Sequence, residues 1–405
     1  MKVIVITRPD VVEREAELIM AALSSGAERV HIRKPEWSAE QAKALIEEIP
    51  PFLRQRLSLH DHFRLADELG VGGINLNSRN TSAGECCAEI VSRSCHSIEE
   101  LQNGDRLSYN FLSPIFDSIS KGRYVANFTM EELEKAGKER VIDNMVIALG
   151  GVTPDKIPTL HKLGFGGVAL LGYAWGDCTV EGVSSRVAAV TKMAKMCSNF
   201  SLQYITHNNG VRCEVDGAIA ALNGGCSWVQ LRMKGASDEE FVEKAKILRE
   251  ECDKRGATFI LNDRAHLVEE CEADGVHLGK EDITPAEARE LLGEEMIIGG
   301  TANTIEDIER LISQGVDYIG YGPFRFTSTK ERLSPVLGLE GYIKATAYIK
   351  KMGYTTPIVA IGGIGVEDIR EIIECGASGI AISGTILNAD DPTSTTERII
   401  DAINL

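Results

Sequence analysis

The stretch Val229-Gln230-Leu231-Arg232-Met233-Lys234 has a counterpart in the first half of the chain, Val30-His31-Ile32-Arg33-Lys34. Each alternates apolar and polar residues, as a β-strand with two different faces does. Further motifs pair in the same order: Leu59–Asp61 with Leu261–Asp263, Gly73–Leu76 with Gly275–Leu278, Ser94–Ile98 with Thr301–Ile305, Pro114–Lys121 with Pro323–Lys330, and Ala148–Val152 with Ala360–Ile364. This shared order predicts that one architecture is repeated along the chain.

Short apolar runs alternate with segments of helical period in both halves, which is the pattern of βα units in an α/β protein with a parallel sheet. The runs of the second half are Leu202–Thr206, Trp228–Lys234, Thr258–Asp263, Gly275–Gly279, Met296–Thr301, Tyr318–Pro323, Ile358–Gly363 and Gly379–Gly384. Eight such units in about 200 residues fit a small (β/α)8 barrel. We predict two tandem (β/α)8 TIM barrels, at residues 1–195 and 201–405, joined between Met193 and Asn199. A doubly wound open sheet is the alternative.

The composition limits the partners of this 405-residue chain. Its net charge is −17, with 43 Lys and Arg against 60 Asp and Glu, and no basic stripe carries interleaved aromatic residues. Nucleic acid and membrane surfaces are therefore not expected partners. The N-terminus lacks a secretion signal and no run is long enough to span a bilayer, so we expect a cytoplasmic protein. The ten cysteines lack zinc-site spacing and are expected to be reduced, buried thiols.

The second predicted strand of the second half carries polar residues on one face. Gln230, Arg232 and Lys234 follow one another at a period of two. If they face inward near the barrel rim, they offer two cations and an amide to an anion. If they face outward, they are solvated surface residues, and the strand by itself favours neither arrangement.

Two acidic residues follow the next two strands. Asp263 comes directly after Asn262, and Asp282 lies shortly beyond the fourth strand. Carboxylates on neighbouring strand ends suit Mg²⁺, which fills its other positions with water and substrate phosphate. Each Asp alone could instead cap the following helix. Their joint position beside Arg232 and Lys234 favours a metal site.

Hydroxyls and glycines end the later strands. Thr327, Ser328, Thr329 and Lys330 supply three hydroxyls and a cation, without the spacing of a Walker A loop. Gly362-Gly363 and Ser383-Gly384 follow strands seven and eight, where barrels commonly bind phosphate. Tight turns would also explain these glycines, but their pairing on adjacent strands favours a phosphate site.

Five ordered motifs run through the second half: Q-L-R-M-K (Gln230–Lys234), N-D-R (Asn262–Arg264), G-V-H-L-G-x-x-D (Gly275–Asp282), G-P-x-x-x-T-x-T-K (Gly322–Lys330) and A-I-G-G-I (Ala360–Ile364). With them, this half resembles the thiamine-phosphate synthase family over essentially its whole length. Thr301 stands where that family usually has Ser, which keeps the hydroxyl. Phe326 stands where it usually has Pro.

The resemblance implies a Mg²⁺-dependent transferase of thiamine biosynthesis. It would condense 4-amino-2-methyl-5-(diphosphomethyl)pyrimidine with 4-methyl-5-(2-phosphoethyl)thiazole and release pyrophosphate. The residues implied to hold the pyrimidine diphosphate are Gln230, Leu231, Arg232, Met233, Lys234, Asn262, Thr301 and Lys330, with His277 as a further substrate-binding residue. Those implied around the thiazole phosphate are Thr327, Ser328, Thr329, Gly363, Ile382 and Ser383. Asp263 and Asp282 would ligate Mg²⁺.

The implied chemistry needs charge rather than a covalent nucleophile. When pyrophosphate leaves the methylene carbon, the aminopyrimidine can delocalise the resulting cation, and the thiazole nitrogen then attacks. Mg²⁺ together with Arg232, Lys234 and Lys330 as catalytic residues would stabilise the departing oxygens.

The first half resembles a diverged copy of the synthase and thiazole tautomerase superfamily. It keeps Arg33, Lys34, Asp61, Ser94, Ser118, Ser120, Lys121 and the Gly150-Gly151 turn. Its differences are His31 for Gln230, His60 for Asn262, Asn75 for His277 and Asn80 for Asp282. The His31-Ile32-Arg33 and Ser94-Cys95-His96-Ser97 segments resemble the tautomerase branch, but Pro114 occupies the place of that branch's histidine. His60-Asp61-His62 could bind a metal, although ordinary loop residues explain it as well. We expect a weakened copy that stabilises the protein, binds a thiazole ligand or regulates.

Two other functions compete with this interpretation. One is another phosphate-binding barrel enzyme, such as a sugar-phosphate isomerase or epimerase, although no convincing acid/base pair is found for it. The other is a non-catalytic protein that binds phosphorylated thiazole. The expected partners are small phosphorylated substrates, and the oligomeric state is left open, with a homo-oligomer among the options.

Overall fold

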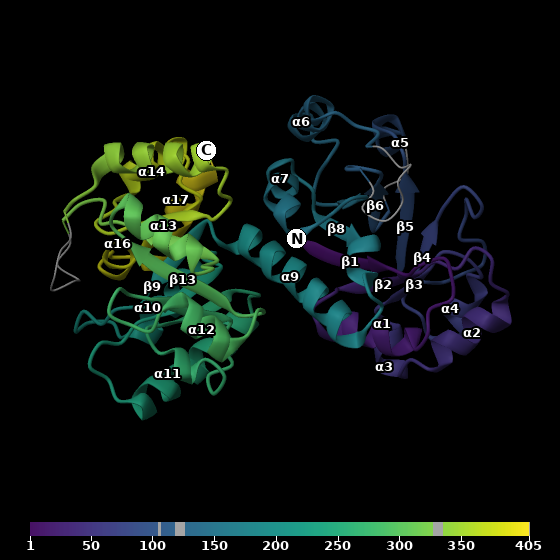
Figure 1. The fold of residues 1–405 in the computed structure, drawn as a ribbon, viewed down its shortest axis with the longest axis horizontal. Coiled ribbons are helices and arrows are strands. Elements are labelled where there is room, and N and C mark those ends of the chain that lie inside the picture. Colours follow the sequence, from purple (N-terminus) through teal and green to yellow (C-terminus); the bar gives the residue numbers. More distant parts are fainter. Residues whose placement is uncertain (104–106, 118–125, 327–334, 405) are drawn as a thin grey trace. The chain divides into compact units, whose positions relative to one another are not determined.

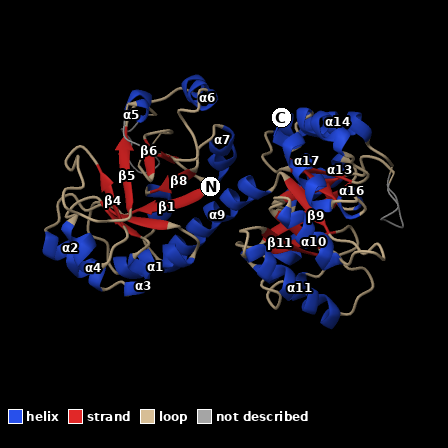
Figure 2. Cartoon of the chain, turned by 180° about the vertical axis from the view of Figure 1, so that it is seen from behind, coloured by secondary structure: helices blue, strands red, loops and turns tan. Residues whose placement is uncertain are grey.

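The computed structural model describes residues 1–103, 107–117, 126–326 and 335–404. The chain divides into two compact units, Met1–Ser198 and Asn199–Leu405. Each unit contains eight strands surrounded by helices (Figures 1 and 2). The junction lies where the long helix α9 ends at Asn199 and the strand β9 begins at Leu202.

The first unit is a closed parallel barrel. Its strands are β1 (Lys2–Ile6), β2 (Arg29–Ile32), β3 (Leu57–Leu59), β4 (Gly73–Leu76), β5 (Ile90–Cys95), β6 (Tyr109–Leu112), β7 (Val146–Leu149) and β8 (Gly167–Leu170). Strand β1 pairs in parallel with both β2 and β8, which closes the sheet on itself.

The second unit repeats this topology. Its strands are β9 (Leu202–Ile205), β10 (Trp228–Leu231), β11 (Thr258–Asn262), β12 (Gly275–Leu278), β13 (Ile297–Ala302), β14 (Tyr318–Tyr321), β15 (Ile358–Ile361) and β16 (Gly379–Ile382). Strand β9 pairs with both β10 and β16 and closes the barrel. The predicted tandem barrels are confirmed and the open-sheet alternative is wrong. Most predicted runs extend past the strand ends because their last residues already belong to the loops at the barrel mouth.

Helices connect the strands in both units. Those of the first are α1 (Glu15–Ser24), α2 (Ala39–Glu47), α3 (Pro51–Arg54), α4 (Arg64–Leu69), α5 (Ile98–Gln102), α6 (Met130–Lys138), α7 (Ile157–Lys162), α8 (Gly172–Trp175) and α9 (Val180–Asn199), with the 3-10 turn η1 (Pro154–Lys156). Those of the second are α10 (Glu214–Asn223), α11 (Asp238–Asp253), α12 (Pro285–Leu292), α13 (Ile305–Ser313), α14 (Gly338–Met352), α15 (Ile369–Glu374), α16 (Gly384–Leu387) and α17 (Pro392–Asn404), with η2 (Ala265–Leu267) and η3 (Val366–Asp368).

The alternation of side chains along each strand separates two cores. In β1, Val3 and Val5 join the large apolar layer between strands and helices, whereas Ile4 and Ile6 belong to a smaller cluster with Tyr109 and Phe111 of β6. Because successive residues of a strand point to opposite faces, the smaller cluster fills the barrel interior.

The same rule settles the orientation of β10. Val229 and Leu231 lie in the apolar layer between strands and helices, and Met233 beyond the strand joins them. Gln230 is buried but does not belong to that layer. The alternation therefore places Gln230 inside the barrel. Of the inward and outward orientations considered for this residue, the inward one is correct.

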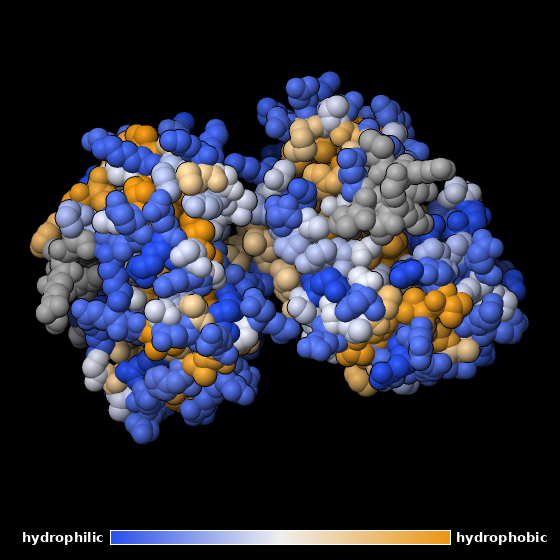
Figure 3. All heavy atoms as spheres, in the orientation of Figure 1, coloured by the Kyte–Doolittle hydropathy of each residue, from blue (hydrophilic) through white to orange (hydrophobic). Residues whose placement is uncertain are grey.

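The surface is largely hydrophilic on the face drawn in Figure 3, where apolar residues gather only in small, scattered groups. Among the described residues, no helix combines the length and the apolarity that crossing a membrane requires. All ten cysteines are free thiols, as expected. Only Cys95, Cys226, Cys252 and Cys271 are buried, so the expectation of buried thiols holds for these four and is wrong for the rest.

Candidate active site

Arg232 follows β10 and is fixed at the mouth of the second barrel by its own main chain. Its amide donates to Oγ1 of Thr206 over 2.8 Å, and that hydroxyl donates to the Arg232 carbonyl over 3.2 Å. One terminal nitrogen of the guanidinium is buried and has no hydrogen-bond partner among the described residues. Burial lowers the pKa of Arg232, and the nearby Asp263 opposes this shift. The group remains a cation with donors available to an anion.

Gln230 and Asn262 form a pair just inside the mouth. Nε2 of Gln230 donates to Oδ1 of Asn262 over 3.0 Å. Oε1 of Gln230 is buried and lacks a partner in the described part of the chain. This amide is therefore oriented by the protein and still presents one acceptor, as a substrate-reading group would.

Asp263 and Asp282 meet at the ends of β11 and β12. Burial of Asp263, together with the proximity and charge of the Asp282 carboxylate, raises the pKa of Asp263 to about 6. The amide of Gly279 donates to Oδ2 of Asp282 over 2.7 Å. A Cβ added at Gly279 would lie 3.1 Å from Asp282 Oδ2 and 3.9 Å from Asp263 Oδ1, so both carboxylates converge on this small residue.

Asp263 holds this place with a left-handed backbone, at a φ of 68°. This conformation is tolerated by Asp better than by most residues, because its short side chain can bond locally. The amide of Asp263 donates to the carbonyl of His277 over 2.9 Å, which ties the loop after β11 to the end of β12.

Neither aspartate caps the helix that follows it. Helix α12 is N-capped by Thr284, whose hydroxyl accepts from the amide of Glu287. The turn η2 is preceded by Arg264, without a side-chain cap. The helix-cap alternative is therefore wrong for both aspartates, and the carboxylates are left facing each other.

His277 lies inside the barrel beneath the mouth. Its Nδ1 is 3.0 Å from the Tyr318 hydroxyl, and its Nε2 is 3.0 Å from Oγ1 of Thr301. Nε2 of Gln203 approaches the same Tyr318 hydroxyl at 3.4 Å. Burial raises the pKa of Tyr318, so this hydroxyl stays neutral. His277 thus positions the Thr301 hydroxyl at the end of β13.

The remaining predicted residues divide into three groups. Lys234 is exposed beyond β10, and Gly363 and Ser383 lie at the ends of β15 and β16. The side chains of Leu231, Met233 and Ile382 are buried in the apolar layer toward the helices, so only their main chain can reach the mouth. Thr327, Ser328, Thr329 and Lys330 lie outside the described residues.

Two supporting interactions were missed by the sequence analysis. Thr206, which fixes Arg232, aligns with Thr7 of the first half, and Oγ1 of Thr7 accepts from the amide of Arg33 over 2.9 Å. The alignment of Thr206 with Thr7 in the two halves could have indicated this role. The guanidinium of Arg325 pairs with both carboxylate oxygens of Asp368 at 2.5 Å and joins the loops after β14 and β15. No sequence spacing indicates that pair.

The corresponding place in the first barrel carries a different arrangement. Asp61 accepts from the Arg79 guanidinium at 3.1 Å through both carboxylate oxygens. Nδ2 of Asn80, which aligns with Asp282, donates to the same Asp61 carboxylate over 3.0 Å. An arginine therefore neutralises the one remaining carboxylate.

His31 and His60 of the first barrel form an interior network with Tyr109. Nδ1 of His31 is 3.0 Å from Nε2 of His60, and Nε2 of His31 is 2.7 Å from the Tyr109 hydroxyl. Burial lowers the pKa of both imidazoles, that of His60 to about 3. His62 points instead to the carbonyl of Trp37 over 2.8 Å. The described residues contain no group of three or more His, Cys, Asp or Glu side chains arranged for a metal ion. Ser118, Ser120 and Lys121 lie outside the described residues.

A protein-family model described as "Thiamine monophosphate synthase" matches the chain twice, over residues 3–173 and 202–386. The chain belongs to the thiamine monophosphate synthase family. The two matches correspond to the two barrels, so both copies descend from this family's fold and the tandem duplication is confirmed.

Individual relatives carry the same description. The chain is 53% identical over 200 residues to a thiamine-phosphate synthase of Phocaeicola vulgatus, which is 49% of this chain and 96% of the relative. It is 52% identical over 201 residues to one of Bacteroides fragilis strain ATCC 25285, covering 50% and 98%. Among solved structures, a thiamine phosphate pyrophosphorylase from Pyrococcus furiosus is 31% identical, covering 52% of this chain and 98% of that chain, with a TM-score of 0.47.

Proposed function

We propose that the second barrel is a Mg²⁺-dependent thiamine-phosphate synthase. It condenses 4-amino-2-methyl-5-(diphosphomethyl)pyrimidine with 4-methyl-5-(2-phosphoethyl)thiazole and releases pyrophosphate. The observation that carries this proposal is the meeting of Asp263 and Asp282 beside Arg232 at one barrel mouth.

The two carboxylates fit a divalent cation. Burial and the nearby charge of Asp282 raise the pKa of Asp263 to about 6, while Arg232 and a hydrogen bond from Asn262 oppose this shift. One or two carboxylates with water and substrate phosphate are the ligand set that Mg²⁺ prefers. Bound there, the ion would supply positive charge that stabilises the leaving diphosphate.

The protein's own groups bind and orient the pyrimidine diphosphate. Arg232 offers guanidinium donors to its oxygens, because one buried terminal nitrogen has no hydrogen-bond partner among the described residues. Gln230 offers a buried acceptor for the exocyclic amine of the ring. Such preorganised groups stabilise the charge that develops on the leaving group without reorganising at the moment of reaction.

Bond breaking then requires no covalent nucleophile. As the methylene carbon loses pyrophosphate, the electron-rich aminopyrimidine delocalises the positive charge, and the thiazole nitrogen attacks the same carbon. Lys234 and Lys330 add cations around the departing oxygens, and the hydroxyls of Thr327, Ser328 and Thr329 with the ends of β15 and β16 hold the thiazole phosphate.

The test is pyrophosphate release by the full chain in the presence of both substrates. We expect turnover with Mg²⁺ and its loss when EDTA removes the ion. Turnover that persists in EDTA would refute the metal dependence. Binding of the thiazole phosphate without any pyrophosphate release would instead support a non-catalytic ligand-binding protein, and interconversion of a sugar phosphate would support an isomerase or epimerase.

A further inference from the structure

A chain of four polar side chains runs through the interior of the second barrel to its mouth. Nε2 of Gln203 on β9 lies 3.4 Å from the hydroxyl of Tyr318 on β14, and that hydroxyl lies 3.0 Å from Nδ1 of His277 on β12. Nε2 of His277 then lies 3.0 Å from Oγ1 of Thr301 on β13. Gln203, Tyr318 and His277 are buried, so their polar atoms depend on partners inside the protein.

The link between Gln203 and Tyr318 gives this chain a direction. An amide nitrogen can only donate, so Nε2 of Gln203 donates to the oxygen of Tyr318. If the same oxygen also accepted from His277, its own buried proton would have no acceptor among the described residues, and an unpaired buried donor is costly. The hydroxyl of Tyr318 therefore donates to Nδ1 of His277, which makes Nδ1 the unprotonated nitrogen of a neutral ring.

The ring proton of His277 then lies on Nε2, which donates to Thr301. Because Oγ1 of Thr301 accepts this bond, its own proton is left for another partner. Within the described part of the chain, no acceptor for that proton is found. Thr301 lies near the end of β13, where the barrel opens, so its hydroxyl is a donor to an anion in the mouth.

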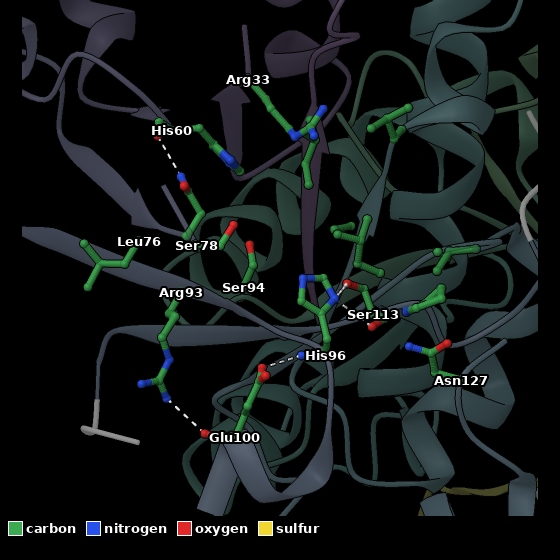
Figure 4. A pocket seen from close by; sticks show the side chains of 18 of the residues that line it. Arg33, His60, Leu76, Ser78, Arg93, Ser94, His96, Glu100, Ser113 and Asn127 are labelled. Carbon is green, nitrogen blue, oxygen red and sulfur yellow. Dashed lines mark hydrogen bonds between the residues drawn. The ribbon is translucent and has the colours of Figure 1, made fainter. Parts of the chain in front are cut away.

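The first barrel orients the matching hydroxyl in the same direction by other means. Ser94 aligns with Thr301 and lines a cavity at the mouth of that barrel (Figure 4). Asn75 aligns with His277, and its Nδ2 donates to Oγ of Ser94 over 3.2 Å. The hydroxyl of Ser92 donates to Oδ1 of Asn75 over 2.9 Å, which fixes the end of the amide that faces Ser94. In both copies, the fourth strand donates to the hydroxyl near the end of the fifth.

The interior of the second barrel leaves room for the two rings of this chain. Gly299 of β13 pairs with His277 across the sheet. A Cβ at this position would clash with the ring of Tyr318 and would lie 2.6 Å from Nδ1 of His277. The first barrel, with the smaller Asn75, carries Ser92 at the corresponding position. Gly299 and His277 are therefore a matched pair, as Ser92 and Asn75 are.

We propose that Gln203 and Tyr318 are positioning residues, which hold His277 in its Nε2–H form so that Thr301 donates a hydrogen bond to the leaving diphosphate. This inference rests on the proposed function for the identity of the anion. Donors that are oriented before the reaction stabilise the charge that develops on the leaving oxygens. Gln203 and Tyr318 act through His277 and need no contact with the substrate.

The ring form of His277 is measured first, on the full chain without substrate. Protein with ¹⁵N-labelled histidine is compared with the His277→Asn variant, which identifies the two ring-nitrogen signals of His277. We expect a protonated Nε2 and an unprotonated Nδ1 at neutral pH. In Gln203→Met the hydroxyl of Tyr318 loses its fixed direction, so we expect a mixture of both ring forms. A proton on Nδ1 in the unaltered protein, or an unchanged spectrum in Gln203→Met, would overturn the proposal.

A double-mutant cycle then tests whether Tyr318 acts through Thr301. Thr301→Val, which keeps the shape of the side chain and removes the hydroxyl, should lower turnover by about a hundredfold. Tyr318→Phe should lower kcat by about tenfold and change KM for the pyrimidine diphosphate less, because an oriented donor matters most as charge develops. Combined with Thr301→Val, Tyr318→Phe should have no further effect.

The matched control is Tyr109→Phe. Tyr109 is the counterpart of Tyr318 in the first barrel, where its hydroxyl lies 2.7 Å from Nε2 of His31, and its loss should leave pyrophosphate release unchanged. If Tyr318→Phe slows turnover equally with and without the Thr301 hydroxyl, the tyrosine acts through packing and the proposal is overturned. Absence of pyrophosphate release from the unaltered protein would refute the proposed function, and the ring form would still decide the positioning of His277.

Discussion

The ends of the third and fourth strands differ between the two barrels in the side chain that faces the first carboxylate. In the second barrel, Asp263 and Asp282 face each other, and burial together with the charge of Asp282 raises the pKa of Asp263 to about 6. In the first, Arg79 and Asn80 supply donors to Asp61, so the protein provides its own cation. The duplicated fold is kept, while an exchange of a few loop residues replaces two carboxylates that face each other by one carboxylate that accepts from an arginine.

The largest expected difference between the two barrels is the effect on turnover of removing the first carboxylate of each one, Asp263 or Asp61. Asp263→Ala should lower turnover by about a hundredfold or more, because a preorganised electrostatic contact to the leaving group is lost. The matched variant Asp61→Ala should leave pyrophosphate release within about twofold of the unaltered protein. Steady-state rates in saturating Mg²⁺ check both, and equal loss in the two variants would contradict the assignment of catalysis to the second barrel.

Lys330 and Lys121, which occupy corresponding positions in the two halves of the sequence, give a second matched test. Lys330→Ala should cut turnover by about a hundredfold, since one cation beside the departing oxygens disappears. Its counterpart Lys121→Ala should have no comparable effect on the same assay. Full activity of Lys330→Ala at saturating substrate would contradict the assignment of Lys330 as a catalytic residue.

The pH dependence of metal binding sharpens the contrast. The pKa of Asp263 is raised from its ordinary value of 3.8 to about 6, so below pH 6 this carboxyl is protonated and the proton competes with Mg²⁺. Apparent Mg²⁺ affinity should be constant above about pH 7 and should fall by about tenfold per pH unit below 6. Calorimetric titrations between pH 5 and 8 measure this, and an affinity that is flat throughout would contradict it.

The smallest expected effect concerns stability without metal. With a raised pKa, folded Asp263 binds more protons than the unfolded chain between about pH 4 and 6, so the free energy of unfolding falls as pH rises through that window. At pH 7 in EDTA, Asp263→Asn should therefore raise the melting temperature slightly. Asp61→Asn should lower it slightly, because the ion pair with Arg79 is lost. Thermal unfolding curves measure the change in melting temperature for both variants. Changes in the same direction would contradict the expected difference between Asp263 and Asp61.

Much of the site was accessible from local sequence because strand ends in a closed parallel barrel converge on one mouth. Asp263, Asp282 and Arg232 were each recognisable as polar residues that end an apolar run, and they do come together. Leu231 and Met233 show the limit of such reasoning. A motif match includes them, but the alternation of the strand turns their side chains toward the helices.

Contacts between segments that are far apart in sequence could not be predicted from strand ends and motifs. The Arg325–Asp368 pair joins two loops whose spacing follows no rule, and the His277–Tyr318–Gln203 chain depends on three strands facing one interior. The exclusion of helix capping also required coordinates, because Thr284 and Asp282 are equally good caps by residue type.

The sequence by itself determined the duplication, the two eight-stranded barrels and the family. The period of the apolar residues and the order of the motifs belong to the chain itself, and burial of the apolar strands and helices then stabilises the fold that they predict. Only the tertiary structure decided which polar groups are paired and which are left available. Whether a carboxylate meets an arginine, as Asp61 does, or another carboxylate, as Asp263 does, depends on distances of a few ångströms between loops far apart in sequence. Electrostatic energy varies steeply over such distances.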